Sequence, residues 1–165
     1  MIGLRLDRAA LDNDHGLREG LLALNNRSAL ETSWLEPARF DHMVMSAFAA
    51  LYVPETQALL LTFDQRADYD SPNFLWFRDR FERFVYVDRI VVDAAARGLG
   101  LARKLYEQLF DLALEAGHDL LACEVNSQPP NPGSDAFHAA MGFVEAGSAA
   151  LTPEKTVRYL TRPLG

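Results

Sequence analysis

The sequence predicts a mixed α/β fold, with helices first, a strand–helix–strand unit in the middle and a hairpin at the end. An apolar strand at 84–92 precedes an amphipathic helix at 101–116 and a second apolar strand at 120–125. A unit of this length favours two parallel strands joined by a right-handed crossover. No shift in composition marks a domain boundary, so residues 1–165 are expected to form one domain.

Composition and charge exclude several classes of protein. The 165 residues carry a formal net charge of −7, so the chain has no general attraction for nucleic acid or for an anionic membrane. No apolar run approaches the roughly 20 residues that span a bilayer. The one cysteine, Cys123, lies in an apolar run and is expected to be a small buried side chain. One cysteine forms no internal disulfide and the first residues lack a signal-peptide core, so we expect a cytoplasmic protein.

The N-terminal half is predicted to hold a short strand, two helices and a core strand. Apolar positions and turn formers predict a strand at Ile2–Asp7, a helix at Asp12–Asn26 and a core strand at Ala58–Phe63. Between them a second helix is expected to begin at Pro37, with an apolar face formed by Phe40, Val44, Ala47 and Phe48. The following stretch, 64–77, is rich in turn formers and aromatic residues. It is expected to be a loop that packs over the core or lines a site.

The C-terminal half gives clearer signals. Residues 84–92 have the highest strand propensity in the chain, and Gly117 suits the position just after the helix 101–116. Asn131 and Pro132 look like the N-cap and first residue of a helix that runs through Met141. Two strands, 143–150 and 155–162, then form a hairpin, which with the aromatic loop offers a surface for a homodimer.

A glycine turn between strand and helix is the first candidate site. Gly98 and Gly100 let the backbone approach a ligand, Arg97 adds a positive charge, and a helix start attracts phosphate through free N–H groups. A turn that serves packing alone is as good an interpretation of the glycines. A dinucleotide fold needs a third glycine where Arg103 stands, and a Walker loop needs Lys and Ser or Thr directly after the last glycine.

Two blocks of sequence resemble the GNAT superfamily of N-acetyltransferases. Val92–Ala102, V-x-x-x-x-R-G-x-G-x-A, is similar to its coenzyme A motif. Asn131–Phe143, N-x-x-S-x-x-F-H-x-x-x-G-F, is similar to its second block, at the family's spacing. The resemblance covers Phe84 to the C-terminus and implies an acyl-CoA N-acyltransferase fold.

The resemblance implies that acetyl-CoA binds along these two blocks. The backbone of the glycine turn would hold the pyrophosphate, the strand Ile90–Val92 would pair with the pantetheine arm, and residues of the second block would contact the same arm. The cofactor-binding residues expected on this basis are Ile90, Val91, Val92, Arg97, Gly98, Leu99, Gly100, Leu101, Ala102, Asn131, Ser134 and Phe137.

Two positions differ from the family pattern. Ala95 stands where the family usually has Gln or Arg, and His138 stands where it often has the tyrosine that protonates the leaving thiolate. Histidine holds a transferable proton near neutral pH, so His138 is a candidate catalytic acid. A half-exposed helix histidine without a chemical role is the alternative.

Direct acetyl transfer also needs a base and a site for developing negative charge. Asp88 and Glu124 on the two central strands are the candidate bases, because a carboxylate in a core strand is costly unless it is paired. Pairing with Arg89 or Arg5 is the alternative explanation, and the preferred one, for either carboxylate. A backbone N–H of Val91 or Val92 would suit the oxyanion.

The predicted activity is N-acetyl transfer from acetyl-CoA to a primary amine of a small molecule or peptide, without a metal ion. The amine-binding pocket is expected from polar and aromatic residues of the N-terminal half, namely Asn25, Asn26, Glu31, Trp34, Tyr69, Asp70, Ser71 and Asn73. A catalytically silent acyl-CoA-binding or sensory module is the second hypothesis, and a simple nucleotide binder is a third.

Overall fold

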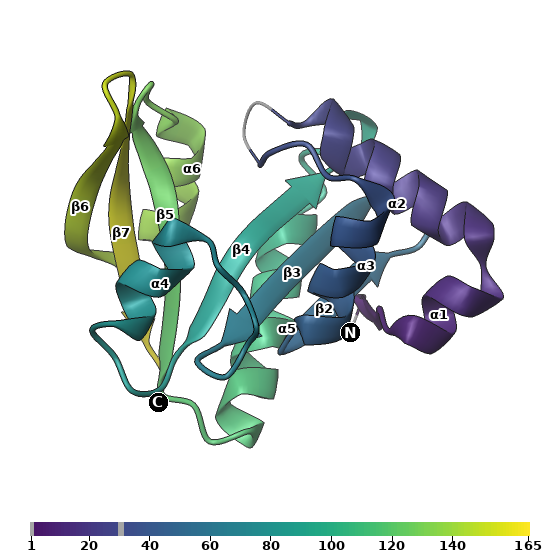
Figure 1. Ribbon diagram of the computed structural model, residues 1–165, viewed down its shortest axis with the longest axis horizontal. Coiled ribbons are helices and arrows are strands. Elements are labelled where there is room, and N and C mark those ends of the chain that lie inside the picture. The colour runs from purple at the N-terminus through teal and green to yellow at the C-terminus, as the bar shows by residue number, and fades with distance from the viewer. Residues whose placement is uncertain (1, 30–31) are drawn as a thin grey trace.

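The computed structural model describes residues 2–29 and 32–165 and contains one seven-stranded sheet with helices on both faces (Figure 1). The strand order is β1-β2-β3-β4-β5-β7-β6. All neighbouring strands are antiparallel except β4 and β5, which are parallel and joined by helix α5. The predicted mixed α/β fold with a central strand–helix–strand unit and a C-terminal hairpin is therefore confirmed.

The N-terminal half contains more elements than the sequence patterns suggest. Its strands and helices are β1 (Leu4–Arg5), α1 (Arg8–Asn13), α2 (His15–Arg27), α3 (Pro37–Ser46), β2 (Ala49–Val53), β3 (Ala58–Asp64) and α4 (Pro72–Arg78). The single helix predicted at 12–26 is two helices, because Asp14 leaves helical geometry and accepts a hydrogen bond from the N–H of Leu17 at 3.0 Å. Asp7 caps α1 in the same way, through the N–H of Ala10.

Two elements differ from the predictions. Ala47 and Phe48 do not extend the face of α3, because that helix ends at Ser46 and the chain turns directly into β2. The predicted aromatic loop contains a short helix, α4, which begins at Pro72. Its apolar side chains Phe74 and Phe77 are fully buried, so tertiary packing stabilises a helix whose sequence looks like a loop.

The C-terminal half follows the predicted order closely. Its elements are β4 (Val85–Val92), the 3-10 turn η1 (Ala94–Ala96), α5 (Leu101–Glu115), β5 (Leu120–Gln128), α6 (Pro132–Ala140), β6 (Val144–Thr152) and β7 (Lys155–Pro163). Asn131 caps α6 by accepting a hydrogen bond from the N–H of Ser134 at 3.2 Å, as predicted. Gly117 follows α5 with a φ of +84°, which suits glycine at a helix end.

The sheet separates two hydrophobic cores. One contains residues of α1–α4, such as Leu21 and Phe40, and the other contains residues of α5, such as Leu105 and Leu109. Burying each of these leucines contributes about 1.5–3 kcal/mol relative to exposure. The two faces of the sheet therefore support different sets of helices, and a gap between strands connects the two sides.

That gap opens between β4 and β5. The two strands pair only at Val85–Leu121 and Tyr86–Ala122, and beyond those residues they diverge (Figure 1). Since parallel neighbours normally continue their ladder of hydrogen bonds, the divergence leaves backbone groups of β4 free to pair with a ligand.

A β-bulge in β4 changes which side chains face which core. Thr62 and Leu61 of β3 are consecutive but face Val87 and Arg89, so Asp88 is an extra residue. Because of this insertion, the side chains on either side of the bulge no longer alternate strictly. Both Asp88 and Arg89 reach the α2–α4 side of the sheet, where their partners lie.

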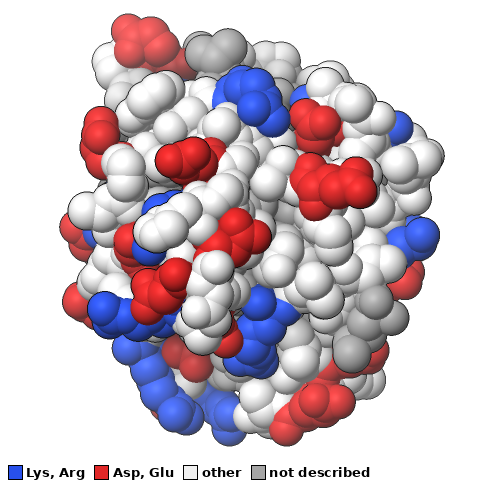
Figure 2. All heavy atoms as spheres, turned by 90° about the vertical axis from the view of Figure 1, so that its right-hand side faces the viewer, with Lys and Arg blue, Asp and Glu red and all other residues white. Residues whose placement is uncertain are grey.

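The surface and helix lengths give two further observations. On the face shown in Figure 2, acidic and basic side chains are interspersed rather than gathered by sign. Among the described residues, no helix is long and apolar enough to cross a bilayer.

Candidate functional site

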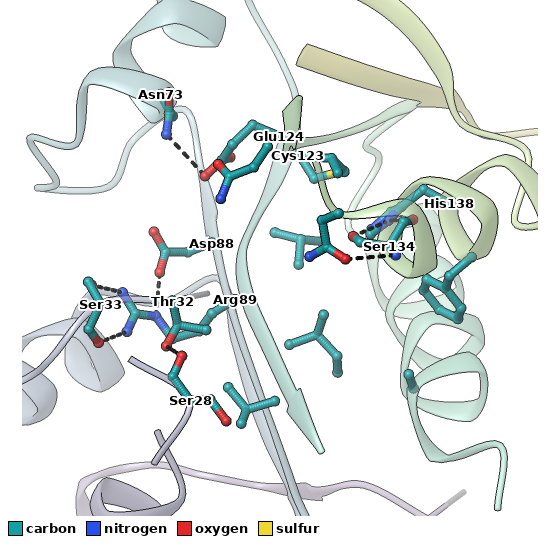
Figure 3. A pocket seen from close by; sticks show the side chains of 18 of the residues that line it. Ser28, Thr32, Ser33, Asn73, Asp88, Arg89, Cys123, Glu124, Ser134 and His138 are labelled. Atoms are coloured by element: carbon teal, nitrogen blue, oxygen red, sulfur yellow. Dashed lines mark hydrogen bonds and ion pairs between the residues drawn. The ribbon is translucent and has the colours of Figure 1, made fainter. Parts of the chain in front are cut away.

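A cavity of about 590 Å³ lies between the diverging strands, and most of the predicted site residues line it (Figure 3). Predicted residues in its wall are Tyr69, Ser71, Asn73, Asp88, Ile90, Val91, Val92, Arg97, Ala102, Glu124, Asn131, Ser134, Phe137 and His138. Elements from both sides of the sheet line the cavity: residues of α5 and α6 form one wall, and residues of α4 and of the segment after α2 form the opposite wall. The strands thus bring the two predicted groups of residues to one place.

On the α5 side, the glycine turn leaves an uncapped helix start. Gly98 and Gly100 have φ values of +84° and +75°, and a Cβ added to either would meet no atom within 4 Å. Gly100 precedes α5 and supplies no side-chain cap, so the first N–H groups of the helix stay available. Arg97 and Ala102 line the cavity, whereas Gly98, Leu99, Gly100 and Leu101 lie beyond its wall.

This geometry fits the pyrophosphate of coenzyme A. The left-handed φ values explain why glycine stands at both positions, and the open space beside them leaves room for a ligand close to the backbone. Free helix N–H groups, the positive end of the helix dipole and the Arg97 guanidinium all favour an anion. The residues present therefore fit the group that the sequence resemblance implies.

On the same side, His138 is buried and has a partner on each ring nitrogen. Its Nδ1 lies 2.8 Å from the carbonyl oxygen of Ser134, which can only accept, so Nδ1 carries the proton. Its Nε2 then accepts a hydrogen bond from the Tyr106 hydroxyl at 2.8 Å. The alternative of a half-exposed histidine is wrong, since only 4% of His138 is exposed.

The buried position changes how His138 titrates. Burial lowers the pKa of the imidazole, and the hydrogen bond to the Ser134 carbonyl only partly opposes that shift. The ring is therefore neutral near pH 7, and its acceptor nitrogen is occupied by Tyr106. Tyr106 itself was not among the predicted residues, because on the helix pattern it is one more apolar core position.

On the opposite side, Asp88 is held by two donors. Its Oδ2 accepts from Nε of Arg89 at 2.6 Å, and its Oδ1 accepts a short hydrogen bond from the Tyr69 hydroxyl. The side chains of Asp88 and Arg89 are only 5% and 4% exposed. Arg89 also donates to Oδ1 of Asn25 at 2.8 Å, so its charge is committed to this cluster. The open explanation that Asp88 pairs with Arg89 is confirmed.

Glu124 has quite different surroundings. Its two carboxylate oxygens accept hydrogen bonds from the Tyr86 hydroxyl at 2.6 Å and from Nδ2 of Asn73 at 3.1 Å. Both donors are neutral, and neither Arg89 nor Arg5 forms an ion pair with Glu124 in the described part of the chain. Asn73 is fixed in turn by the Tyr159 hydroxyl, which donates to its Oδ1 at 2.9 Å.

Desolvation raises the pKa of Glu124 to about 7, against the lowering effect of the hydrogen bonds from Tyr86 and Asn73. A carboxylate that titrates near neutral pH and lines a cavity is suited to accept a proton from an amine. Asp88 is a poorer candidate, because its charge is paired with Arg89, whereas the two donors to Glu124 are neutral. The structure therefore separates two carboxylates that the sequence left equivalent.

Four of the predicted amine-binding residues lie outside the cavity wall and have other contacts. Asn25 is fully buried and holds Arg89 and the carbonyl of Ser33, while Asn26 bonds to the backbone of Leu35. Trp34 is 64% exposed with its Nε1 bonded to Glu36, and Asp70 pairs with Arg39. Glu31 lies outside the described residues. The two asparagines thus shape the segment after α2 instead of facing a ligand.

Several cavity residues were not predicted as site residues from the sequence. They are Ser28, Thr32, Ser33, Val87, Arg89, Tyr106, Cys123, Val125, Asn126, Gly133 and Lys155. Of these residues, Arg89 is the one that the sequence could have identified, because a charged guanidinium inside the predicted strand of highest strand propensity needs buried partners. For Ser28 and Ser33, nothing in a polar loop sequence distinguishes a residue in a cavity from one facing solvent.

Comparisons with known proteins agree with this geometry. A profile of the acetyltransferase (GNAT) family matches residues 61–143. Over 64 residues the chain is 41% identical to an Oryza sativa subsp. japonica protein named "Probable glucosamine 6-phosphate N-acetyltransferase 2". That match covers 38% of this chain and 34% of the relative, so it spans only about a third of the rice protein.

Solved structures share the fold over almost the whole chain. A chain of the NatC complex bound to Gag peptide and CoA superposes with a TM-score of 0.71 at 14% identity, covering 99% of this chain and 98% of that one. The ribosomal-protein-S18-alanine N-acetyltransferase of Escherichia coli gives 0.64 at 17% identity, with 99% and 93% covered. A Salmonella typhimurium protein solved with its cofactor acetyl-CoA gives 0.68 at 16% identity, with 99% and 93% covered.

Proposed function

The chain belongs to the GNAT acetyltransferase family, and on that premise we propose that it transfers the acetyl group of acetyl-CoA directly to a primary amine. The observation that carries the proposal is the cavity between β4 and β5. One of its walls has an anion-binding helix start, and the other has a carboxylate whose pKa is about 7. Activated acyl donor and amine would then meet through the gap in the sheet.

The glycine turn and the second block would hold acetyl-CoA. The N–H groups at the start of α5 and the Arg97 guanidinium would bind the pyrophosphate, and the backbone groups of Ile90 and Val92 that point away from β3 would pair with the pantetheine arm. Asn131 caps α6 through its Oδ1, so its amide nitrogen remains free to donate to that arm. Bound there, acetyl-CoA supplies the acetyl group as a thioester, which is reactive toward a neutral amine.

Glu124 would generate that neutral amine. Near pH 7 a primary amine in water is mostly protonated, as ammonium. The ammonium must lose a proton before its nitrogen can attack a carbonyl carbon. The Glu124 carboxylate accepts this proton, directly or through one water, and the backbone N–H of Val92, which points away from β3, donates to the carbonyl oxygen as its negative charge grows. Before the proton moves, the Glu124 carboxylate would bind the ammonium group, because its hydrogen-bond donors in the described chain are neutral.

His138 would contribute by holding Tyr106. The imidazole has no spare proton near neutral pH, and its Nε2 fixes the hydroxyl of Tyr106 in the cavity wall. We therefore place His138 as a positioning residue. When the C–S bond breaks, solvent water protonates the departing thiolate and takes up the second proton, which the nitrogen loses as the amide forms. This replaces the sequence-based hypothesis that His138 itself donates that proton.

A catalytically silent acyl-CoA-binding module is the second candidate function. The observation in its favour is that the position of the family's usual tyrosine acid is filled by a buried, fully hydrogen-bonded histidine. The cofactor-binding wall would be the same in both cases, so binding alone does not distinguish them.

Thiol release and product mass distinguish the two functions. Acetyl-CoA is incubated with the protein and a panel of amino sugars, polyamines, amino acids and N-terminal peptides. The transferase predicts amine-dependent thiol release and an acetylated amine detected by mass spectrometry. Tight acetyl-CoA binding with no release above background for the whole panel would reject the enzyme and support the silent module.

A further inference from the structure

The cavity wall opposite α5 and α6 contains only polar residues in the described part of the chain before β4. Each cavity-lining residue in that part of the described chain carries a hydroxyl or an amide, and these residues are Ser28, Thr32, Ser33, Tyr69, Ser71 and Asn73. We propose that the amine acceptor is a polyhydroxylated primary amine of the amino-sugar type. This inference rests on the proposed function, because it names the class of amine that the same site accepts.

Some of these polar groups have no partner among residues 2–29 and 32–165 and can bind a ligand. Among the described residues, the hydroxyls of Ser28 and Ser71 form no hydrogen bond, and neither does the side-chain amide of Asn126 on β5. Thr32 donates to the carbonyl of Ser28 at 3.1 Å and can still accept (Figure 3). Ser33 accepts from Arg89 at 3.4 Å and can still donate. The wall therefore offers both donors and acceptors, as a hydroxylated ligand requires.

The charges on this wall favour an amine whose other substituents are neutral. Glu124 has no cationic partner and suits the ammonium group. The Arg89 guanidinium already binds Asp88, Asn25 and Ser33, and it has no free edge to offer a phosphate. Lys155, which is exposed, is the remaining cation among the described lining residues outside the Arg97 region. Hydroxyl substituents match this wall better than an anionic group does.

An apolar acceptor matches this wall poorly. The apolar side chains of the cavity come from β4 and β5 and from α5 and α6, such as Val125, Ala102 and Phe137, which would face the acetyl-CoA arm. A leucine-like side chain placed against Ser28 and Ser71 would remove their hydroxyls from water without replacing those hydrogen bonds. Peptides with an apolar first residue are thus disfavoured.

Calorimetric titration into the CoA-saturated protein tests the inference without requiring turnover. Glucosamine and cyclohexylamine form a matched pair, since both are amines on six-membered rings and only one is hydroxylated. We expect glucosamine to bind at least about tenfold more tightly, the size of a few modest hydrogen bonds. In Ser71→Ala this preference should fall several-fold, while in Ser148→Ala, an exposed serine of β6 outside the cavity wall, it should not change.

Three binding results would overturn the inference. These are equal or tighter binding of cyclohexylamine, tighter binding of a leucine N-terminal peptide, and a large gain in affinity for glucosamine 6-phosphate over glucosamine. The proposed function fails separately. If glucosamine binds as expected but acetyl-CoA releases no thiol in its presence, the acceptor class stands and the transfer does not. If cyclohexylamine is acetylated faster than glucosamine, the transfer stands and the acceptor class does not.

Discussion

Glu124 and Asp88 are carboxylates on neighbouring strands, yet their partners give them different chemistry. Asp88 is neutralised by Arg89, whereas Glu124 accepts only from the neutral donors Tyr86 and Asn73. The sequence predicts both as candidates, because a charge in a core strand stands out. It cannot separate them, because the bulge at Asp88 and the position of Asn73 on α4 arise from tertiary structure.

The raised pKa of Glu124 predicts a pH-dependent effect on stability. The folded protein holds the proton more tightly than the unfolded chain, since the pKa rises from 4.5 to about 7. Its contribution is thus favourable at low pH and is lost as the pH rises through about 7. Glu124→Gln does not titrate, so the melting temperature of the variant relative to wild type should be higher at pH 8 than at pH 5. A pH-independent difference would contradict the burial of this charge.

Among arginine-to-alanine variants, we expect Arg89→Ala to lose the most stability. Arg89→Ala leaves the Asp88 carboxylate buried without its cation, which costs about 3–5 kcal/mol of unfolding free energy. Arg158 is the control, because it also pairs with carboxylates, Asp135 and Glu145, but its side chain is 36% exposed. Arg158→Ala should cost only about 0–1 kcal/mol. Urea denaturation measures both, and similar losses would show that the Asp88–Arg89 pair is not buried.

His138 and Tyr106 are predicted to act as one unit in turnover. His138→Ala and Tyr106→Phe should each lower kcat by about tenfold and leave the Kd for acetyl-CoA unchanged. The double variant should lose little more than either single one, because both changes remove the same hydrogen bond. The pH profile of His138→Ala should keep its shape. If the wild-type rate falls at high pH and the rate of His138→Ala does not, His138 is a proton donor instead.

The two ends of α5 provide a matched test of the anion site. Gly100 precedes the helix and Gly117 follows it, with φ values of +75° and +84°. A glutamate at either position places a side chain at a left-handed φ, so this backbone strain is common to both variants. Only Gly100→Glu places negative charge at the helix start, and we expect it alone to abolish acetyl-CoA binding in a fluorescence titration. Normal binding by Gly100→Glu would mean that the pyrophosphate lies elsewhere.

The elements that the sequence predicted well are those whose own pattern decides their structure. Helix α5 has a long amphipathic face, a glycine turn before it and Gly117 after it, and its predicted range agrees with the structure within one residue. Strand β2 and helix α4 were missed for the opposite reason. Each is short, and each is stabilised by neighbours: β2 pairs with β3, and the aromatic side chains of α4 pack in the core. Local patterns contain little information about such elements.

At the scale of the whole molecule, the two halves of the chain supply different parts of the cavity. The C-terminal half supplies the glycine turn, α6 and both central strands, and its motifs were readable because backbone geometry demands particular residues there. The N-terminal half supplies the polar wall, where function depends on which loop residues face the cavity. Tyr69, Ser71 and Asn73 line it as expected, whereas Asn25 and Asn26 support Arg89 and the backbone after α2. Predicting that difference requires the packed structure.

The pH dependence of acetyl transfer shows whether Glu124 is the base. The measurement is kcat/KM for amine-dependent thiol release, in wild type and Glu124→Gln, across neutral pH. We expect the wild-type rate to fall as the pH drops below about 7, because Glu124 is then protonated and accepts no proton. Glu124→Gln should lose about 10²–10⁴-fold in rate and retain its affinity for acetyl-CoA. A variant that keeps the wild-type rate and the same pH limb would contradict the claim that this cavity and its carboxylate perform the transfer.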